Sequence, residues 1–167
     1  MRKYYIGVIG GSKPEEKFKH IAFEVGKLLA ESNAIIISGG LNGVMEATSR
    51  GAFENHGTVI GILPEEVRGS ENPYVTYTIP TGMGYARNFL VARSSEALIA
   101  IDGASGTLSE ASFAISEGRD VIGIESHIIK KMKDEEGEYF IASNPKEAVE
   151  MALKSAEKFV RNRVSLS

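Results

Sequence analysis

Three glycine-rich turns, each directly after a short apolar run, constrain the fold of this chain more than any other feature. The turns occupy residues 10–12, 38–43 and 102–107. A strand that ends in glycine and leads into a helix leaves backbone N–H groups and the positive end of the helix dipole open to an approaching anion. Three such turns in one chain predict a face that binds phosphate.

Apolar runs of strand length alternate with amphipathic segments of helix length. The runs are residues 4–9, 34–38, 58–63, 75–79, 97–101 and 121–124. Because each run is almost continuously apolar, it is typical of a strand in a parallel sheet that is covered on both faces. We therefore expect a doubly wound α/β fold with a mainly parallel sheet of six or seven strands and helices on both faces.

The composition is that of one globular domain, and residues 1–167 are expected to form it. Of the 167 residues, 43% are hydrophobic and 25% are charged, which is enough to fill a core and to cover it with a polar surface. The formal net charge of -3 argues against long electrostatic contacts with nucleic acid. The chain has no cysteine, which excludes disulfides and thiolate chemistry.

The start of the chain and its apolar runs give no sign of export or of membrane insertion. Residues 1–3 lead straight into a strand-like run instead of an apolar signal core. No apolar stretch approaches the roughly 20 residues that span a bilayer. We expect no membrane partner and a cytoplasmic location.

Several residue patterns predict where helices begin. Cap residues followed by proline or glutamate predict helix starts near Ser12, Thr107 and Asn144. The last of these helices is expected to span residues 145–160, with its apolar face against the sheet. The charged run within residues 126–138 predicts a solvated turn, as in a hairpin that leads to a strand at 139–141.

The motifs of several common site classes are absent. The first turn, at 10–12, departs from G-x-G-x-x-G, and the second strand ends at Ser38, where a dinucleotide-binding fold has the acidic residue that binds ribose. No Gly-Lys-Ser/Thr of a Walker-type loop follows a glycine turn, and no G-x-S-x-G of a serine hydrolase is present. The histidines lack ligand spacing, so we expect no metal site; they are His20, His56 and His127.

Three segments, residues 38–45, 81–88 and 103–110, resemble motifs of one superfamily. It contains the LOG-type cytokinin riboside 5'-monophosphate phosphoribohydrolases and the molybdenum cofactor carrier proteins. The resemblance extends from about residue 6 to residue 124, and it implies a Rossmann-like sheet, a phosphate site at the strand ends and a homodimer. Older labels of this superfamily name lysine decarboxylase. No lysine stands in the Schiff-base context that a pyridoxal cofactor needs, so we do not expect that activity.

The two branches of the superfamily imply different functions. The hydrolase branch resembles P-G-G-x-G-T-x-x-E and G-M-H-x-R-K, and by position it implies Glu110 and Arg87 as the residues for N-glycosidic cleavage. In this chain residues 102–104 are Asp-Gly-Ala in place of Pro-Gly-Gly, and Gly84 and Asn88 replace the histidine and the lysine. The carrier branch, whose implied ligand is a phosphorylated pterin, is therefore the closer match.

We expect this protein to bind a phosphorylated nucleotide-like or pterin ligand at its glycine-rich turns, as the carrier branch implies. One alternative is a LOG-type hydrolase that cleaves the N-glycosidic bond of nucleoside 5'-monophosphates, and another is a nucleotide-sensing regulatory protein. We expect that no cofactor is required; the ligand itself would be of the molybdopterin type or a nucleotide. The fold by itself does not separate these functions, because one scaffold supports different chemistries.

The residues expected to bind the ligand come from the three turns and from the arginine motif. They are Gly10, Gly11, Ser38, Gly39, Gly40, Asn42, Gly43, Glu46, Arg87, Asn88, Gly103, Ser105, Gly106, Thr107 and Glu110. Backbone amides at two helix starts, together with a bidentate Arg87, would surround a phosphate group.

Several side chains near these turns have a second interpretation. Glu110 stands three residues after Thr107, so it is equally suited to a capping box. Glu46 follows the second turn as Glu110 follows the third, which makes it the candidate second carboxylate of a hydrolase. Met83 and Tyr85 fit the core or a subunit contact better than stacking on a base.

Overall fold

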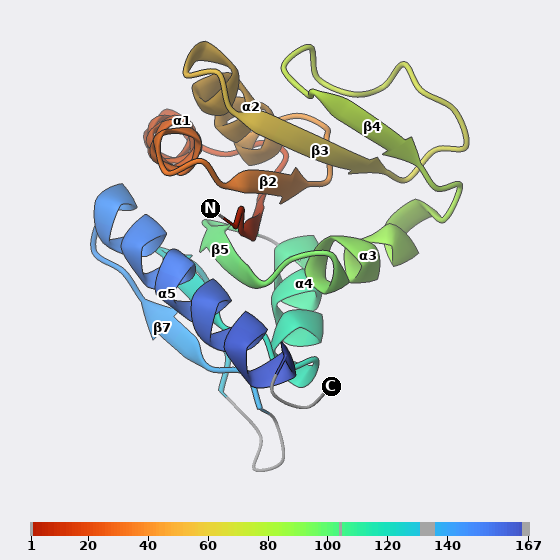
Figure 1. Cartoon of the computed structure of the whole chain (residues 1–167). Coiled ribbons are helices and arrows are strands. Elements are labelled where there is room, and N and C mark those ends of the chain that lie inside the picture. Colours follow the sequence, from red (N-terminus) through yellow and green to blue (C-terminus); the bar gives the residue numbers. More distant parts are fainter. Residues whose placement is uncertain (1, 104, 131–135, 165–167) are drawn as a thin grey trace.

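A seven-stranded sheet, parallel throughout, forms the centre of the molecule in the described residues (Figure 1). The structure is a computed structural model, and it describes residues 2–103, 105–130 and 136–164. The strands are β1 (Tyr5–Gly10), β2 (Ile35–Ser38), β3 (Thr58–Leu63), β4 (Tyr77–Pro80), β5 (Ala97–Ile101), β6 (Val121–Ile124) and β7 (Tyr139–Ile141). Their order across the sheet is β4-β3-β2-β1-β5-β6-β7.

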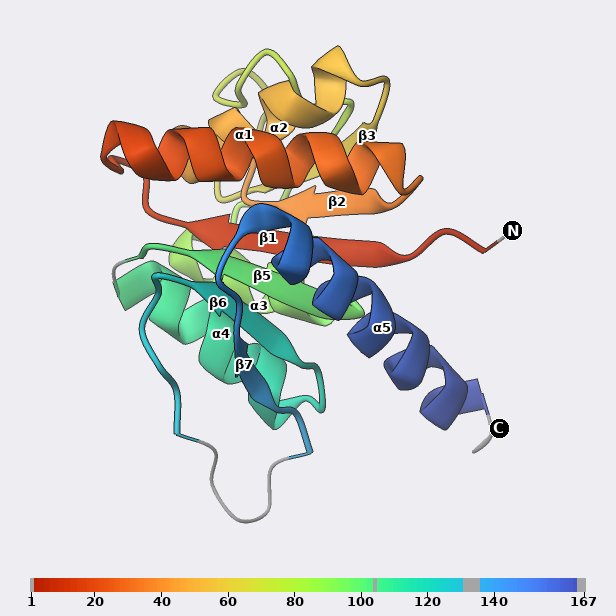
Figure 2. The same cartoon turned by 90° about the vertical axis from the view of Figure 1, so that its left-hand side faces the viewer.

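Helices in the described residues cover both faces of this sheet. They are α1 (Glu16–Glu31), α2 (Val44–Glu54), the 3-10 helix η1 (Gly84–Ala86), α3 (Arg87–Arg93), α4 (Ser105–Ser116) and α5 (Pro145–Val164). Helices α1, α2 and α5 pack on one face and α3 and α4 on the other; Figure 2 shows α1 and α5 in front of the strands. None of the described helices is long and apolar enough to cross a membrane.

The central strands are apolar on both faces because helices cover each face. On β5, Ala97, Ile99 and Ile101 belong to the core cluster under α1, α2 and α5, whereas Leu98 and Ala100 belong to the cluster under α3 and α4. All five side chains are at most 1% exposed. This alternation with a period of two, on a strand without polar residues, explains the continuous apolar runs of the sequence.

Two glycines bring α1 and α2 into backbone contact. A Cβ atom added at Gly26 of α1 would lie 2.0 Å from the carbonyl oxygen of Thr48, and one added at Gly51 of α2 would lie 2.0 Å from that of Phe23. Real Cβ atoms do not approach oxygen so closely, so only glycine fits at both positions. The close crossing holds α2 against α1, and the start of α2 borders the site described below.

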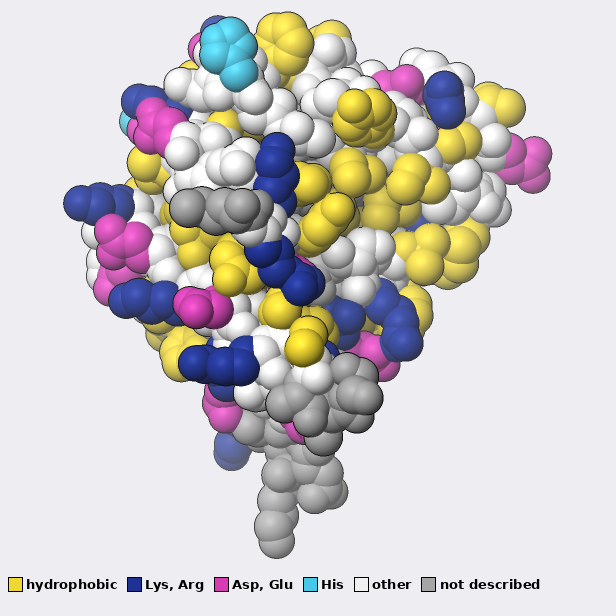
Figure 3. Space-filling model, viewed as in Figure 1, with side chains coloured by type: hydrophobic (Ala, Val, Ile, Leu, Met, Phe, Trp, Pro, Cys, Tyr) yellow, Lys and Arg dark blue, Asp and Glu magenta, His cyan; other side chains and the backbone are white. Residues whose placement is uncertain are grey.

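Hydrophobic side chains also gather on part of the surface, over β3 and β4 (Figure 3). On the edge strand β4, Tyr77 is 63% exposed and Ile79 is 49% exposed. Strand β4 has only four residues. A short edge strand offers few unpaired backbone groups to another chain.

The expected doubly wound fold is confirmed, with a sheet that is wholly parallel in the described residues. The hairpin expected at 126–138 is wrong, because β7 pairs in parallel with β6 and Tyr139 lies beside Val121. A parallel partner requires that the chain return to the other end of the sheet. Residues 131–135 of this connection lie outside the described residues.

Two of the three expected helix starts are shifted. Helix α1 begins at Glu16, four residues later than expected, and no side chain caps it. Helix α4 begins at Ser105, which puts Thr107 inside its first turn. The start of α5 is confirmed, since the Glu147 amide donates to Asn144 Oδ1 at 2.9 Å. This helix ends four residues later than expected.

Candidate functional site

A cavity of about 290 Å³ opens where the carboxyl ends of β1 and β2 meet the starts of α3 and α4. The connection after β1 leads to α1 on one face of the sheet, and the connection after β5 leads to α4 on the other face. Since β1 and β5 are neighbours, the chain switches faces between them. Open α/β sheets bind ligands at such a switch point.

Arg87, the first residue of α3, is buried in the cavity wall with 7% of its surface exposed. Its Nη1 donates a hydrogen bond to Asn88 Oδ1 and lies 3.7 Å from Glu110 Oε1. Its Nε has no hydrogen-bond partner among the described residues, which is costly for a buried donor. Burial lowers the pKa of Arg87 below its ordinary value. The groups in the part of the chain that the structure describes therefore satisfy this guanidinium only in part.

Glu110, in the second turn of α4, is the carboxylate that faces Arg87. Burial raises the pKa of Glu110 from 4.5 to about 7, against the opposing effect of the Arg87 charge. Burial therefore favours the protonated form of this carboxyl group far more than in an exposed glutamate, and a pKa raised toward neutral pH suits proton transfer. The capping box with Thr107 is not formed, because α4 begins two residues earlier and Glu110 faces the guanidinium instead.

A series of hydrogen bonds connects Asn88 to the start of α4. Asn88 Nδ2 donates to Ser109 Oγ at 3.4 Å, and Ser109 Oγ donates to the carbonyl oxygen of Gly106 at 2.8 Å. Asn88 Oδ1 accepts a hydrogen bond from Arg87. These bonds hold Arg87 and Gly106 in one arrangement toward the same cavity.

Bare glycine backbone forms part of the cavity wall. A Cβ atom at Gly39 would lie 2.6 Å from Arg87 Nη2, so a side chain there would displace the guanidinium. Among the described residues, the atom nearest to a Cβ atom added at Gly106 would be Asn88 Nδ2 at 3.8 Å, so this backbone borders open space. The first-turn amides of α4, including those of Gly106 and Thr107, have no intrahelical acceptors and lie at the positive end of the helix dipole.

The structure brings together residues from all three glycine turns and from the arginine motif. Of the fifteen expected residues, eight line the cavity: Gly10, Gly11, Gly39, Arg87, Asn88, Gly106, Thr107 and Glu110. The other seven do not line it: Ser38, Gly40, Asn42, Gly43, Glu46, Gly103 and Ser105.

Local packing explains why parts of the turns face away. The Gly40 amide, expected to be open to an anion, donates instead to Ser38 Oγ at 3.0 Å. Gly43 and Glu46 line a separate groove between α1 and α2. Glu46 is therefore not the expected second carboxylate beside Glu110.

The remaining three residues are occupied elsewhere or point to solvent. Asn42 and Ser105 are exposed. The carbonyl oxygen of Gly103 lies 2.9 Å from His127 Nε2. None of them contributes to the wall that holds Arg87.

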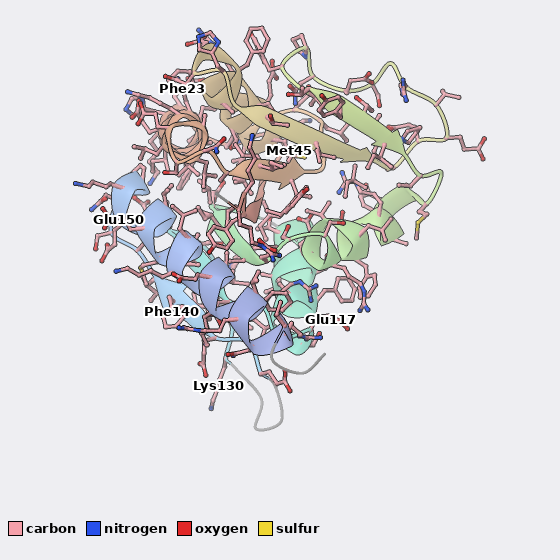
Figure 4. All side chains as sticks on the ribbon, viewed as in Figure 1. Phe23, Met45, Glu117, Lys130, Phe140 and Glu150 are labelled. Carbon is pink, nitrogen blue, oxygen red and sulfur yellow. The ribbon has the colours of Figure 1, made fainter. Side chains whose placement is uncertain are left out.

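Six residues line the cavity that were not expected to do so: Val8, Ile9, Ser12, Leu41, Met45 and Tyr85. Most of them are apolar, and Figure 4 shows Met45 beside β2. Tyr85 is 92% exposed and Met83 is 46% exposed, so neither lies in the core, which was one of the two places expected for them. The other, a subunit contact, stays a prediction. The signal that could have identified Tyr85 is its place in the glycine-rich segment directly before Arg87.

Comparison with known proteins shows the family of this chain. The model of the SLOG cluster4 family matches residues 3–149. The chain belongs to the SLOG cluster4 family. An uncharacterized protein of Archaeoglobus fulgidus is 38% identical over 159 residues, which are 95% of this chain and 100% of that protein.

A second relative of this SLOG cluster4 chain is a probable LOG-type enzyme, with which it shares a shorter match. The probable cytokinin riboside 5'-monophosphate phosphoribohydrolase LOGL9 of Oryza sativa subsp. japonica is 30% identical over 102 residues. The match covers 59% of this chain and 45% of the rice protein. The chain thus spans less than half the length of that relative.

Two solved structures have the same fold. The molybdenum cofactor binding protein of Rippkaea orientalis is 33% identical, with a TM-score of 0.84, and the match covers 93% of this chain and 98% of that one. The molybdenum cofactor carrier protein of Chlamydomonas reinhardtii is 27% identical, with a TM-score of 0.80, covering 92% of this chain and 98% of that one. The superfamily resemblance of the three motifs is confirmed.

Proposed function

We propose that this protein binds a phosphorylated small molecule in the cavity, with a phosphorylated pterin of the molybdenum cofactor type as the first candidate. The proposal rests on Arg87, a buried cation whose Nε lacks a partner among the described residues and which lines a cavity with bare glycine in its wall. A bound oxyanion would complete the hydrogen bonding of the guanidinium.

The groups around Arg87 suit a phosphate monoester. A planar guanidinium offers parallel N–H donors to two oxygen atoms, and the start of α4 at Gly106 and Thr107 adds amides at the same cavity. Charge-assisted hydrogen bonds contribute roughly 1.5–3 kcal/mol each. A few of them, after the cost of association, support a micromolar Kd, which corresponds to about −8 kcal/mol.

The size and the apolar wall of the cavity support a ligand with one ring system beside its phosphate. The volume of about 290 Å³ is at the small end of the range of roughly 300–1,000 Å³ for ligand sites. Val8, Ile9, Leu41 and Met45 provide apolar surface for a ring. The similarity to the proteins of Rippkaea orientalis and Chlamydomonas reinhardtii, which their names connect with the molybdenum cofactor, favours a pterin.

Hydrolysis of nucleoside 5'-monophosphates is the second candidate, and one observation favours it. Glu110 is buried beside Arg87 with a pKa near 7, as suits a general acid or base. Glycosidic cleavage ordinarily uses two carboxyl groups that flank the bond. Glu46 lies in a different groove, so Glu110 is the only carboxyl group among the described residues that line the cavity. Binding is therefore the better supported function.

Calorimetric titration with a synthetic pterin phosphate, with AMP and with GMP tests the proposal. We expect a saturable Kd in the micromolar range for at least one of these ligands, and a loss of roughly thirty-fold or more in Arg87→Met, which removes the charge-assisted bonds. Arg50→Met is the matched control, because Arg50 is exposed and lines the other groove. Absence of binding of all three ligands would refute the proposal.

Chromatography of the same nucleotide mixtures separates binding from hydrolysis. A carrier leaves the nucleotides intact over hours. Sustained release of free base by the unchanged chain, abolished in Glu110→Gln, would replace the binding function with the hydrolase.

A further inference from the structure

We infer that Tyr85 selects the ligand by stacking its phenol ring on a planar heterocycle at the mouth of the cavity. The inference rests on the proposed function and adds a residue that chooses among phosphorylated compounds. Its basis is the unusually high exposure of this aromatic side chain. Tyr85 lines the cavity that contains Arg87, and yet it is 92% exposed, although a large aromatic side chain gains most from being covered.

The position of Tyr85 is set by its backbone. Hydrogen bonds fasten the segment before it to residues 63–65, at the end of β3 and just after it. Thr81 Oγ1 and the Thr81 amide donate to the Leu63 carbonyl at 2.6 and 3.2 Å, the Gly82 amide donates to the Glu65 carbonyl at 2.8 Å, and the Gly84 amide donates to the Pro64 carbonyl at 3.0 Å. Gly82 and Gly84 have φ angles of 64° and 54°, a backbone conformation that residues other than glycine rarely adopt. Tyr85 is thus presented to solvent by an anchored turn.

The side chain itself has no fixed partner. Within the described residues, the Tyr85 side chain takes part in none of the aromatic contacts, hydrogen bonds or ion pairs, and no cation–π contact includes its ring. Its backbone carbonyl accepts a hydrogen bond from the Arg87 amide. A ring that is exposed and unpaired is free to cover a ligand without breaking a contact. This distinguishes it from Phe89, which packs edge-on against Phe113 at 5.5 Å between centroids.

The positions of Arg87 and Tyr85 at the mouth of the cavity set the orientation of such a ligand. Arg87 is 7% exposed and Tyr85, two residues earlier, is 92% exposed, so the cation lies inside and the aromatic ring outside. Leu41 and Met45 add apolar surface to the same cavity. A ligand whose phosphate reaches Arg87 would therefore have its ring near Tyr85, and stacking on aromatic side chains accepts any planar base.

The test compares two ligands that share a phosphate and differ in the ring. AMP has a planar heterocycle and ribose 5-phosphate has none, and each is titrated calorimetrically against the unchanged chain, Tyr85→Phe and Tyr85→Ala. We expect Tyr85→Ala to weaken AMP binding by about ten-fold or more and to change ribose 5-phosphate binding by less than about two-fold. Tyr85→Phe, which keeps the ring, should bind both within about two-fold of the unchanged chain.

Tyrosine emission gives an independent readout, because the chain has no tryptophan. AMP should quench part of the emission, ribose 5-phosphate should not, and the quenched part should be missing in Tyr85→Phe. Circular dichroism verifies that both variants fold. The exposure of Tyr85 predicts that they do.

The outcomes separate this inference from the proposed function. If the unchanged chain binds both ligands with equal affinity, or if Tyr85→Ala weakens both equally, stacking is refuted and phosphate binding stands. If the unchanged chain binds neither ligand, the stacking inference fails, and the titration with the pterin phosphate and GMP decides the proposed function separately. If light scattering shows that Tyr85→Ala changes the subunit number while AMP affinity is kept, Tyr85 is a subunit contact and the inference is wrong.

Discussion

Arg87 Nη1 lies 3.7 Å from Glu110 Oε1, and each of the two side chains is 9% exposed. The pair shares a cavity with the first turn of α4, where helix amides attract anions. A phosphate group that approached Arg87 would also approach the Glu110 carboxylate, and like charges repel. Anion binding should therefore favour the protonated form of Glu110.

This coupling predicts that affinity for a phosphate monoester falls as pH rises above the pKa of Glu110, which burial raises to about 7. The ligand itself is a dianion above roughly pH 6, so a titration series from pH 7 to pH 8.5 isolates the protein group. We expect a loss of roughly ten-fold over this range, since one proton must be taken up. In Glu110→Gln the affinity should be nearly constant over the range. An equal decline in both proteins would show that Glu110 is not the titrating group.

The same group predicts how folding stability depends on pH. The pKa of Glu110 is higher in the folded chain than its ordinary 4.5, so the folded state binds more protons between the two values. The free energy of unfolding from this group is then highest below about pH 4.5, falls as pH rises to about 7, and is constant above that. As pH rises from about 4.5 to about 7, the free energy of unfolding of the unchanged chain should fall by up to about 3 kcal/mol relative to that of Glu110→Gln. Urea unfolding at several pH values measures the difference, and a difference that rises with pH would contradict it.

Two glycines of the cavity should respond differently to alanine. Gly39→Ala places a Cβ atom 2.6 Å from Arg87 Nη2 and 2.7 Å from Met45 Sδ, so the guanidinium must move, and ligand affinity should fall by roughly ten-fold or more. Gly106→Ala has room within the protein, with Asn88 Nδ2 at 3.8 Å. It should keep its stability within about 0.5 kcal/mol and still weaken binding, because the methyl group occupies ligand space. Unchanged affinity in Gly106→Ala would place the ligand away from α4.

The crossing of α1 and α2 should tolerate no side chain at Gly51. Alanine is a better helix former than glycine, but its Cβ atom would lie 2.0 Å from the Phe23 carbonyl oxygen. We expect Gly51→Ala to lower the free energy of unfolding by roughly 2–4 kcal/mol. Chemical denaturation measures this, with Gly106→Ala as the control for a helical glycine in open space. If Gly51→Ala left the free energy of unfolding unchanged or raised it, α1 and α2 would be able to move apart at little cost.

Arg119 should contribute more to stability than the exposed Arg93. Arg119 is 8% exposed and donates to the carbonyl oxygens of Ser95, Glu117 and Arg93. Arg119→Met removes all three donors, and we expect a loss of about 3 kcal/mol. Arg93→Met removes a surface ion pair with Glu117 and should cost less than about 1 kcal/mol. Thermal and denaturant unfolding of the two variants measures both losses. Equal losses of stability would show that the hydrogen bonds from Arg119 to buried carbonyl oxygens contribute nothing extra.

The arginine motif and the third glycine turn identified the central pair correctly as neighbours. Arg87 and Glu110 lie 23 positions apart in the sequence, and each follows a strand of the predicted parallel sheet. Parallel strands have their carboxyl ends at one edge, so residues after different strands converge there. The fold class was predictable from a different property, since strands covered on both faces are almost wholly apolar.

Other parts of the site were not predictable from the turns. Glu46 and Glu110 occupy matching places after two similar turns, yet they line different cavities. The sequence shows that each acid is near a helix start. It does not show which side of the helix faces the ligand, because that depends on how α2 packs against α1 at Gly26 and Gly51.

The sequence by itself determined the alternation of strands and helices, the places where strands end in glycine, and the motifs that contain Arg87 and Glu110. The alternation and the strand ends follow from the local apolar period and from backbone freedom, which neighbouring residues decide. The two motifs were recognised by their resemblance to one superfamily. Only the tertiary structure decided that β7 runs parallel to β6, that Ser38 occupies the Gly40 amide and that Tyr85 stands exposed at the cavity. Each of these three facts depends on contacts between distant segments or on the backbone path of a turn. The hydrophobic pattern of the sequence specifies neither the contacts nor the path.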